Sequence, residues 1–313
     1  MMARLFLVGL AILAASACTP ATIPAPAPQV LQVRDQPIGK ILYVREGNLW
    51  VWEAGEVRQL TTGGTWRQPS LSPDGTEIAY AYWEQNFADL FTMASDGTNS
   101  RRLTRGQSVV VGDSDWSIRP AWSPDGSQIA FLSDVTTYLP VLWIMNKDGS
   151  GRRQIMTPAS NLESADAIAW GPDGKRLAVT AFTARDPSQI YLIDVTRGAT
   201  ERFTSHAQGA FDPAWSPDGN SIAYIGRESG RGELWLRRVD GSAEAHFGKL
   251  PFVRSPAWSP DGRNLAVLSA QGGNFELWLG TVRTEGDTLQ FGEFRQLTRD
   301  GGVDAVSGLS WAK

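Results

Sequence analysis

The sequence has only one cysteine, Cys18, and two histidines, His206 and His246, among its 313 residues. A single cysteine excludes an internal disulfide and a metal cluster built on cysteine. Two histidines, without a metal-ligand spacing, do not resemble a histidine-rich metal site. The chain also has no excess of basic charge, with 29 Lys and Arg against 33 Asp and Glu. Nucleic acid is therefore not an expected partner.

The sequence also lacks an apolar run of the roughly 20 residues that a transmembrane helix needs. Its apolar segment near the N-terminus covers residues 5–15, follows Arg4 and ends at the small residues Ala-Ser-Ala of 15–17. This order predicts a signal peptide over residues 1–17. It resembles a bacterial lipobox, which implies that Cys18 receives a lipid, although Ala15 stands where that motif usually has Leu. An ordinary secretory signal is the alternative, and both interpretations predict an extracytoplasmic protein.

Proline and small residues alternate over residues 19–28. Such a segment favours extended polyproline II structure and cannot form a core. We therefore expect residues 18–38 to be the lipidated cysteine and a Pro-rich stalk, which tethers the rest of the chain to the cell membrane or the outer membrane.

One turn motif recurs through the remaining sequence. Ser-Pro-Asp-Gly is found at 72–75, 123–126, 216–219 and 259–262, and Gly-Pro-Asp-Gly at 171–174. A short apolar segment lies on each side of every copy, so each copy predicts a β-hairpin. Each hairpin is followed by a third segment, which contains an aliphatic–aromatic pair, and most repeats end with a more polar fourth segment. In the fifth repeat this fourth segment, near residues 245–247, is degenerate. Four strands in 40–50 residues are typical of a propeller blade.

The two ends of the chain predict how the ring closes. Residues 41–61 match the second, third and fourth strands of a repeat, and residues 309–311 match a first strand. Together they make a sixth blade and remove an open sheet edge. The predicted fold is an all-β, six-bladed propeller of four-stranded blades over residues 39–313, closed by a C-terminal first strand that joins the N-terminal strands.

The repeat Pro-x-Trp-Ser-Pro-Asp-Gly-x-x-Ile-Ala-Phe at 120–131 resembles the propeller repeat of TolB. Related repeats occur in the propeller caps of prolyl oligopeptidases. The resemblance covers residues 39–313 and implies a TolB-like propeller, carried here by a bacterial lipoprotein. TolB has an α/β domain before its propeller and is free in the periplasm, whereas residues 19–38 are too few for a domain and Cys18 is predicted to be lipidated. A Tol–Pal role therefore does not follow from the resemblance.

Two kinds of recurring residue are expected to be structural. The Asp of each Pro-Asp-Gly hydrogen-bonds its own turn. The tryptophans that recur once per blade pack between neighbouring sheets; these are Trp122, Trp170, Trp215, Trp258 and Trp311. Three tryptophans outside the repeat, Trp66, Trp83 and Trp116, are candidates for exposed contacts, with a role in covering the core as the alternative.

A binding site is expected where the loops into the innermost strands gather around the channel, because loops on a rigid scaffold favour recognition. The residues just before these strands are Gln68, Arg119, Ala167, Asp212, Ser255 and Gly308, with Arg67, Asp115, Asp166, Arg254 and Asp304 nearby. The longest such loop, residues 105–119, contains three consecutive valines and Trp116. The predicted partner-binding residues are Gln68, Arg119, Asp212, Arg254, Ser255 and Trp116.

Three functions are compatible with this sequence. The first is a non-catalytic, monomeric scaffold at the cell envelope, whose channel-mouth loops bind a protein or peptide. The second is a carbohydrate or cell-wall binder that uses Trp66, Trp83 or Trp116. The third is a carboxylate-based hydrolase or lyase; no Gly-x-Ser-x-Gly elbow or phosphate-binding loop is present. No cofactor is expected, apart from a Ca²⁺ ion in the channel, for which Asp166, Asp212 and Asp304 are the candidate oxygen ligands.

Overall fold

A computed structural model describes residues 38–313 except 229 and 286–287. The predicted signal peptide (1–17), Cys18 and all but the last residue of the predicted stalk lie outside the described residues. Within those residues, no helix has the length and apolar character to cross a membrane.

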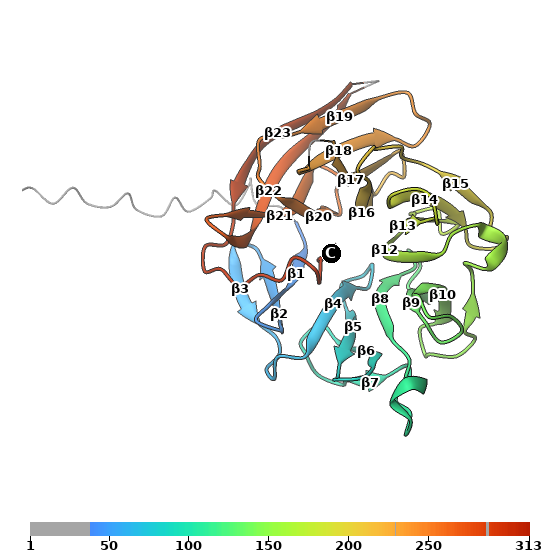
Figure 1. The fold of residues 1–313 in the computed structure, drawn as a ribbon. Helices are drawn as coiled ribbons and strands as arrows, with labels where there is room; N and C mark the ends of the chain where they lie inside the picture. The colour runs from blue at the N-terminus through green and yellow to red at the C-terminus, as the bar shows by residue number, and fades with distance from the viewer. Residues whose placement is uncertain (1–37, 229, 286–287) are drawn as a thin grey trace, which may run out of the picture. The chain divides into compact units, whose positions relative to one another are not determined.

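Six four-stranded antiparallel sheets surround a central channel (Figure 1). We number them as blades one to six in chain order. Blade one contains β24 (Leu309–Ala312), β1 (Lys40–Arg45), β2 (Asn48–Glu53) and β3 (Glu56–Gln59). Blade two contains β4 (Trp66–Leu71), β5 (Glu77–Trp83), β6 (Ala88–Ala94) and β7 (Arg101–Arg102). Blade three contains β8 (Ser117–Trp122), β9 (Gln128–Ser133), β10 (Val141–Asn146) and β11 (Arg153–Gln154).

The second half of the ring repeats this plan. Blade four contains β12 (Ser164–Trp170), β13 (Arg176–Phe182), β14 (Gln189–Asp194) and β15 (Thr200–Arg202). Blade five contains β16 (Ala210–Trp215), β17 (Ser221–Arg227), β18 (Gly232–Arg238) and β19 (Glu244–Phe247). Blade six contains β20 (Val253–Trp258), β21 (Asn264–Gln271), β22 (Asn274–Glu285) and β23 (Thr288–Gln296). Short 3₁₀ helices lie in two connections, η2 (Val111–Asp113) and η3 (Pro158–Ser160).

The predicted all-β, six-bladed fold is confirmed, including its closure. β24 pairs with β1 in an antiparallel register that places Ile41 opposite Trp311 and Lys40 opposite Ala312. The segment predicted to be degenerate, residues 245–247, nevertheless forms β19 and pairs with β18. The fourth strand of blade five therefore pairs normally, although its sequence lacks the polar and aliphatic pattern of the other fourth strands.

The Pro-Asp-Gly turns have the structural role expected for them. In four copies the Ser hydroxyl donates to the Asp carboxylate at 2.5–2.6 Å, and the amide two residues after the Asp donates to the same carboxylate. The hydrogen bond from Ser72, followed by those from Thr76, lowers the pKa of Asp74, and those from Ser123 and Ser127 do the same for Asp125. These carboxylates therefore stay ionised and hold the turns.

The hydrophobic core is divided into six clusters, and each fills the space between two neighbouring blades. The repeated tryptophans belong to these layers, as predicted. Trp122 donates its indole N–H to the Ser70 carbonyl of the preceding blade at 3.1 Å, and Trp258 donates to the Ala214 carbonyl at the same distance. The first strands are therefore joined around the channel by side chains as well as by packing.

A second repeated device fixes the loops that enter the first strands. In blade two, Thr104 Oγ1 accepts from the Leu90 amide and donates to the buried carboxylate of Asp89, which also accepts from the Gly106 amide. Gln189 with Thr204, and Glu276 with Thr298, make the corresponding contacts in blades four and six. These buried hydrogen bonds position the start of each connecting loop.

Candidate functional site at the channel mouth

The two faces of the ring differ because every first strand runs in the same direction. Each begins after the loop from the preceding blade, and all of them except β24, which lies at the C-terminal end of the chain, end at a Pro-Asp-Gly turn. We call the face with the connecting loops between blades the mouth face, and the face with the Pro-Asp-Gly turns the turn face. In an antiparallel blade, the loops between second and third strands also lie on the mouth face.

The first strands carry a kink close to the mouth. In blades two, three, five and six the pairing register shifts there, and one residue has a positive φ between 50° and 56°. A proline follows each of these residues, and because proline has no N–H for the ladder, a bulge is favoured at this point. The four residues are Gln68, Arg119, Asp212 and Ser255.

The bulges aim their side chains at the channel. Together with Ala167 of blade four and Gly308 of blade one, the four residues line a constriction of about 100 Å³. The structure therefore brings together the six positions that the sequence placed before the innermost strands. Ala167 does not share the positive φ, and no proline follows it.

Asp212 is the most deeply held charge of this ring. Its carboxylate accepts from Arg254 Nε at 2.7 Å and from the Ser255 amide at 3.0 Å, and its side chain is only 7% exposed. Burial alone would raise the pKa of Asp212, but the charge and hydrogen bonds of Arg254, with a contribution from Arg119, outweigh it and lower the pKa. Asp212 is therefore an ionised, buried group that joins blade five to blade six.

Similar contacts connect most of the other blades. Gln68 Oε1 accepts from the Arg119 amide at 3.0 Å, and Ser255 Oγ donates to the Ala305 carbonyl at 3.3 Å. Arg67 lies 3.8 Å from a carboxylate oxygen of Asp304. Two ion pairs, Asp212 with Arg254 and Arg119 with Asp166, add to these contacts. Among the described residues, side chains at the mouth therefore bridge five of the six interfaces between blades. The interface between blades four and five is the exception at this level, where Ala167 replaces a polar residue.

Arg119 reaches across the channel. Its Nη2 donates to Asp166 of blade four at 3.3 Å, and its Nη1 would lie 3.9 Å from a Cβ placed on Gly308 of blade one. Its Nε is buried and has no hydrogen-bond partner among the described residues. The guanidinium therefore narrows the channel at the mouth and keeps unused hydrogen-bonding capacity there.

The three carboxylates predicted to hold Ca²⁺, those of Asp166, Asp212 and Asp304, have other partners in the structure. Each of these carboxylates faces an arginine instead of the other two, and Asp304 also accepts hydrogen bonds from the Val306 amide and the Ser307 hydroxyl. Over residues 38–313, the gaps aside, no three acidic, histidine or cysteine side chains converge as metal ligands would. Arginine positive charge at these oxygens opposes a cation.

The three tryptophans outside the repeat are packed rather than exposed. Trp66 contacts Tyr80 with ring centroids 4.7 Å apart and donates its indole N–H to the Thr62 carbonyl. Trp83 and Trp116 meet edge to face at 5.5 Å. All three are half-buried, so the interpretation as cover for the core edge fits them better. Trp116 lies in the connecting loop of blade three and is not among the residues that line the constriction.

Most of the exposed large apolar side chains lie in loops of the mouth face. Nine large apolar residues are exposed in the described part of the chain, and seven of them lie in loops of this face. These seven are Val109, Val110, Val135, Tyr138, Leu139, Phe252 and Val306. Of these residues, only the valines of the 105–119 loop were predicted from the sequence as a possible contact surface. Tyr138-Leu139, an apolar pair inside a loop between two strands, was a signal that could have identified a second contributor.

His206 lies in the loop between blades four and five and His246 on β19 of blade five, and neither lines the constriction. His206 Nδ1 is 2.5 Å from Glu228, its Nε2 is 3.1 Å from the Tyr224 hydroxyl, and that hydroxyl donates to Glu244. His246 stacks on Trp235, whose ring also contacts His206. These groups are used within the blade.

Comparisons with known proteins agree with this architecture. Residues 105–247 match the TolB beta propeller domain family. A TolB homologue of Chlorobium luteolum is 28% identical over 162 residues, which cover 52% of this chain and 34% of the relative. An uncharacterised peptidase of Bacillus subtilis, YuxL, is 28% identical over 187 residues, covering 56% of this chain and 24% of the relative.

Among solved structures, TolB from Acinetobacter baumannii superimposes with a TM-score of 0.67 at 20% identity, covering 88% of this chain and 66% of that one. This likeness concerns the fold. The described part of the chain is a six-bladed β-propeller, and residues 105–247 of it are similar to the TolB propeller domain. The matched segments amount to about a third or less of the length of these two curated relatives.

Proposed function

We propose that the chain is a non-catalytic scaffold that binds a protein partner on its mouth face. The observation that carries the proposal is that seven of the nine large apolar side chains exposed in the described residues lie in loops of this face. Exposed apolar groups that share one face favour an interaction surface on that face. Aromatic anchors such as Tyr138, which is fully exposed, are typical of such surfaces.

The charged ring supports this proposal at the centre of the same face. Asp166 keeps 58% of its side chain exposed beside Arg119, and Arg254 keeps 27%. A partner that reaches the constriction meets both signs of charge, which favours a specific orientation. Gln68, Asp212 and Ser255 are buried, and their side chains hydrogen-bond to neighbouring blades. Their proposed contribution is therefore to hold the charged ring at the mouth in place.

The alternatives have weaker support. A carboxylate-based hydrolase or lyase needs two close carboxylates without structural partners, whereas the three at the mouth each face an arginine. A glycan binder needs a free aromatic face, and the three candidate tryptophans are packed against other aromatic rings. The name Tol-Pal system protein TolB, borne by a Bordetella pertussis relative that is 30% identical over 167 residues, favours an envelope protein as the partner.

The experiment is affinity capture after crosslinking in cells, with mass spectrometry of the retained proteins. The test variant combines Tyr138→Ser, Phe252→Ser and Val306→Ser, which change only exposed side chains. Val57→Ser, an exposed valine on β3, is the matched control. We expect one envelope protein to be retained by the natural chain and the control and lost from the triple variant. Identical retention by all three chains would refute binding on the mouth face.

We also propose that the protein is extracytoplasmic and anchored through a lipid on Cys18. The residues before Cys18 carry this part of the proposal, through their resemblance to a lipobox. Labelling of cells with radioactive palmitate should mark the protein and fail to mark Cys18→Ala. Labelling that persists in the variant would contradict the anchor.

A further inference from the structure

Blade six departs from the repeat on the turn face. Its third and fourth strands, β22 and β23, contain 12 and 9 residues, whereas the third strands of the other blades contain 6 or 7 and the fourth strands 2 to 4. The pairing of β22 with β23 shifts register between Gly280 and Val282 and then continues. The extra length carries this hairpin past the point where the other blades turn back.

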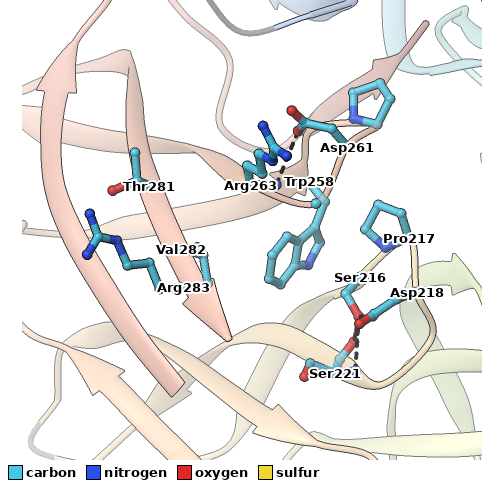
Figure 2. A pocket seen from close by; sticks show the side chains of 12 residues that line it. Ser216, Pro217, Asp218, Ser221, Trp258, Asp261, Arg263, Thr281, Val282 and Arg283 are labelled. Atoms are coloured by element: carbon cyan, nitrogen blue, oxygen red, sulfur yellow. Dashed lines mark hydrogen bonds between the residues drawn. The ribbon is translucent and has the colours of Figure 1, made fainter. Parts of the chain in front are cut away.

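The extension forms one wall of a cavity of about 710 Å³ between blades five and six (Figure 2). Thr281 and Arg283 of β22 lie on this wall, and the two Ser-Pro-Asp-Gly turns at 216–219 and 259–262 form the others. The indole of Trp258 lies between them (Figure 2). The volume falls in the range of about 300–1,000 Å³ that is usual for ligand pockets.

The acidic groups in this pocket are already occupied by the turns. Asp218 accepts from the Ser216 hydroxyl and from the amide and side chain of Asn220. Burial opposes its ionisation, but these hydrogen bonds outweigh burial and lower the pKa of Asp218. Asp261 accepts from the Ser259 hydroxyl and from the Arg263 amide.

The basic groups, in contrast, are unused. The side chains of Arg263 and Arg283 are exposed, and neither guanidinium has an ion pair or hydrogen bond with the residues that the structure describes. Each guanidinium offers five N–H donors in a planar fork that matches a carboxylate. The exposed Thr281 hydroxyl lies on the same wall as Arg283 (Figure 2). The free hydrogen-bonding capacity of the pocket is therefore mostly that of a donor.

We infer that this pocket binds the carboxylate side chains of an acidic peptide segment from a protein partner, held by Arg263 and Arg283. A carboxylate carries one negative charge, which the two arginines can neutralise despite the nearby Asp218 and Asp261. The site lies on the opposite face from the channel mouth, so the propeller can hold a second partner while the mouth is occupied.

Fluorescence anisotropy of labelled peptides in low salt tests this site. The probe is a decapeptide of alternating Glu and Ser, and its control has Gln in place of Glu. We expect the Glu peptide to bind and the Gln peptide not to bind. Arg263→Gln and Arg283→Gln should each weaken binding about fivefold, as loss of an exposed charge pair does. Arg197→Gln, an exposed arginine in a turn-face loop of blade four, is the matched control and should leave binding unchanged.

Several results would overturn the inference. They are absence of binding by the Glu peptide, equal binding of the Gln peptide, and equal weakening by Arg197→Gln, which would show non-specific attraction. Competition by inorganic phosphate at lower concentration than the peptide would assign the pocket to a phosphate ligand instead. Because both variants change exposed side chains, circular dichroism should show an unchanged fold. The mouth-face variant with Ser at positions 138, 252 and 306 should bind the peptide normally, which separates this test from that of the proposed function.

Discussion

Removal of the Asp212 carboxylate should weaken the whole ring. Asp212→Ala leaves the guanidinium of Arg254, 27% exposed, and the Ser255 amide without their shared acceptor. Breaking a buried ion pair from one side costs about 3–5 kcal/mol, and the partial exposure of Arg254 places this case near 3 kcal/mol. Asp212→Asn should cost less, because the amide oxygen can still accept from Ser255.

Equilibrium urea unfolding, followed by tryptophan fluorescence, measures this change. A double-mutant cycle with Arg254→Ala isolates the pair, and we expect a coupling free energy of about 2 kcal/mol. The pKa of Asp212 is lowered in the folded state, so its contribution to stability is present above the unfolded pKa of about 3.9 and is lost as pH falls through the folded pKa. The deficit of Asp212→Ala should therefore narrow below about pH 4. A deficit under about 0.5 kcal/mol at pH 7, or additive single and double variants, would refute this account of the ring.

Three further predictions concern the elements that hold the blades. Thr104→Val should destabilise the protein by about 1–3 kcal/mol in urea, because it leaves the buried Leu90 amide without an acceptor; an unchanged midpoint would contradict the role of this hydrogen bond. Trp258→Phe should cost about 1 kcal/mol more than Trp215→Phe, since only the Trp258 indole N–H has a partner, and equal costs would assign both to packing alone. Deletion of residues 309–313 should lower the melting temperature and expose blade one to limited proteolysis, because β1 loses its partner strand; an unchanged digestion pattern would argue against closure by β24.

The repeat made the fold predictable, whereas the local contacts of the site were only partly predictable. Five copies of Pro-Asp-Gly with flanking apolar segments set the strand order, and the incomplete ends left one way to close the ring. Comparison of the repeat copies also placed Gln68, Arg119, Asp212 and Ser255 at the channel. It could not show that their side chains are occupied by neighbouring blades, because these partners are 42–51 residues away along the chain.

Departures from the repeat were harder to interpret. Trp66, Trp83 and Trp116 look like free residues because they break the pattern, yet each packs against another aromatic ring. The long hairpin of blade six was hidden because its aliphatic–aromatic pair at Leu277-Trp278 follows the pattern. Its excess length depends on where the strands turn back, and the repeat does not encode that point.

Site-specific photo-crosslinking can show whether the mouth face contacts a protein in the cell. A photoreactive phenylalanine analogue would replace Tyr138 or Phe252 on the mouth face, and Val57 on the outer strand of blade one. After illumination of living cells, the two mouth-face positions should give a discrete adduct with the same protein, and position 57 should give none. Adducts of equal yield at all three positions, or none at positions 138 and 252, would contradict a protein-binding mouth face.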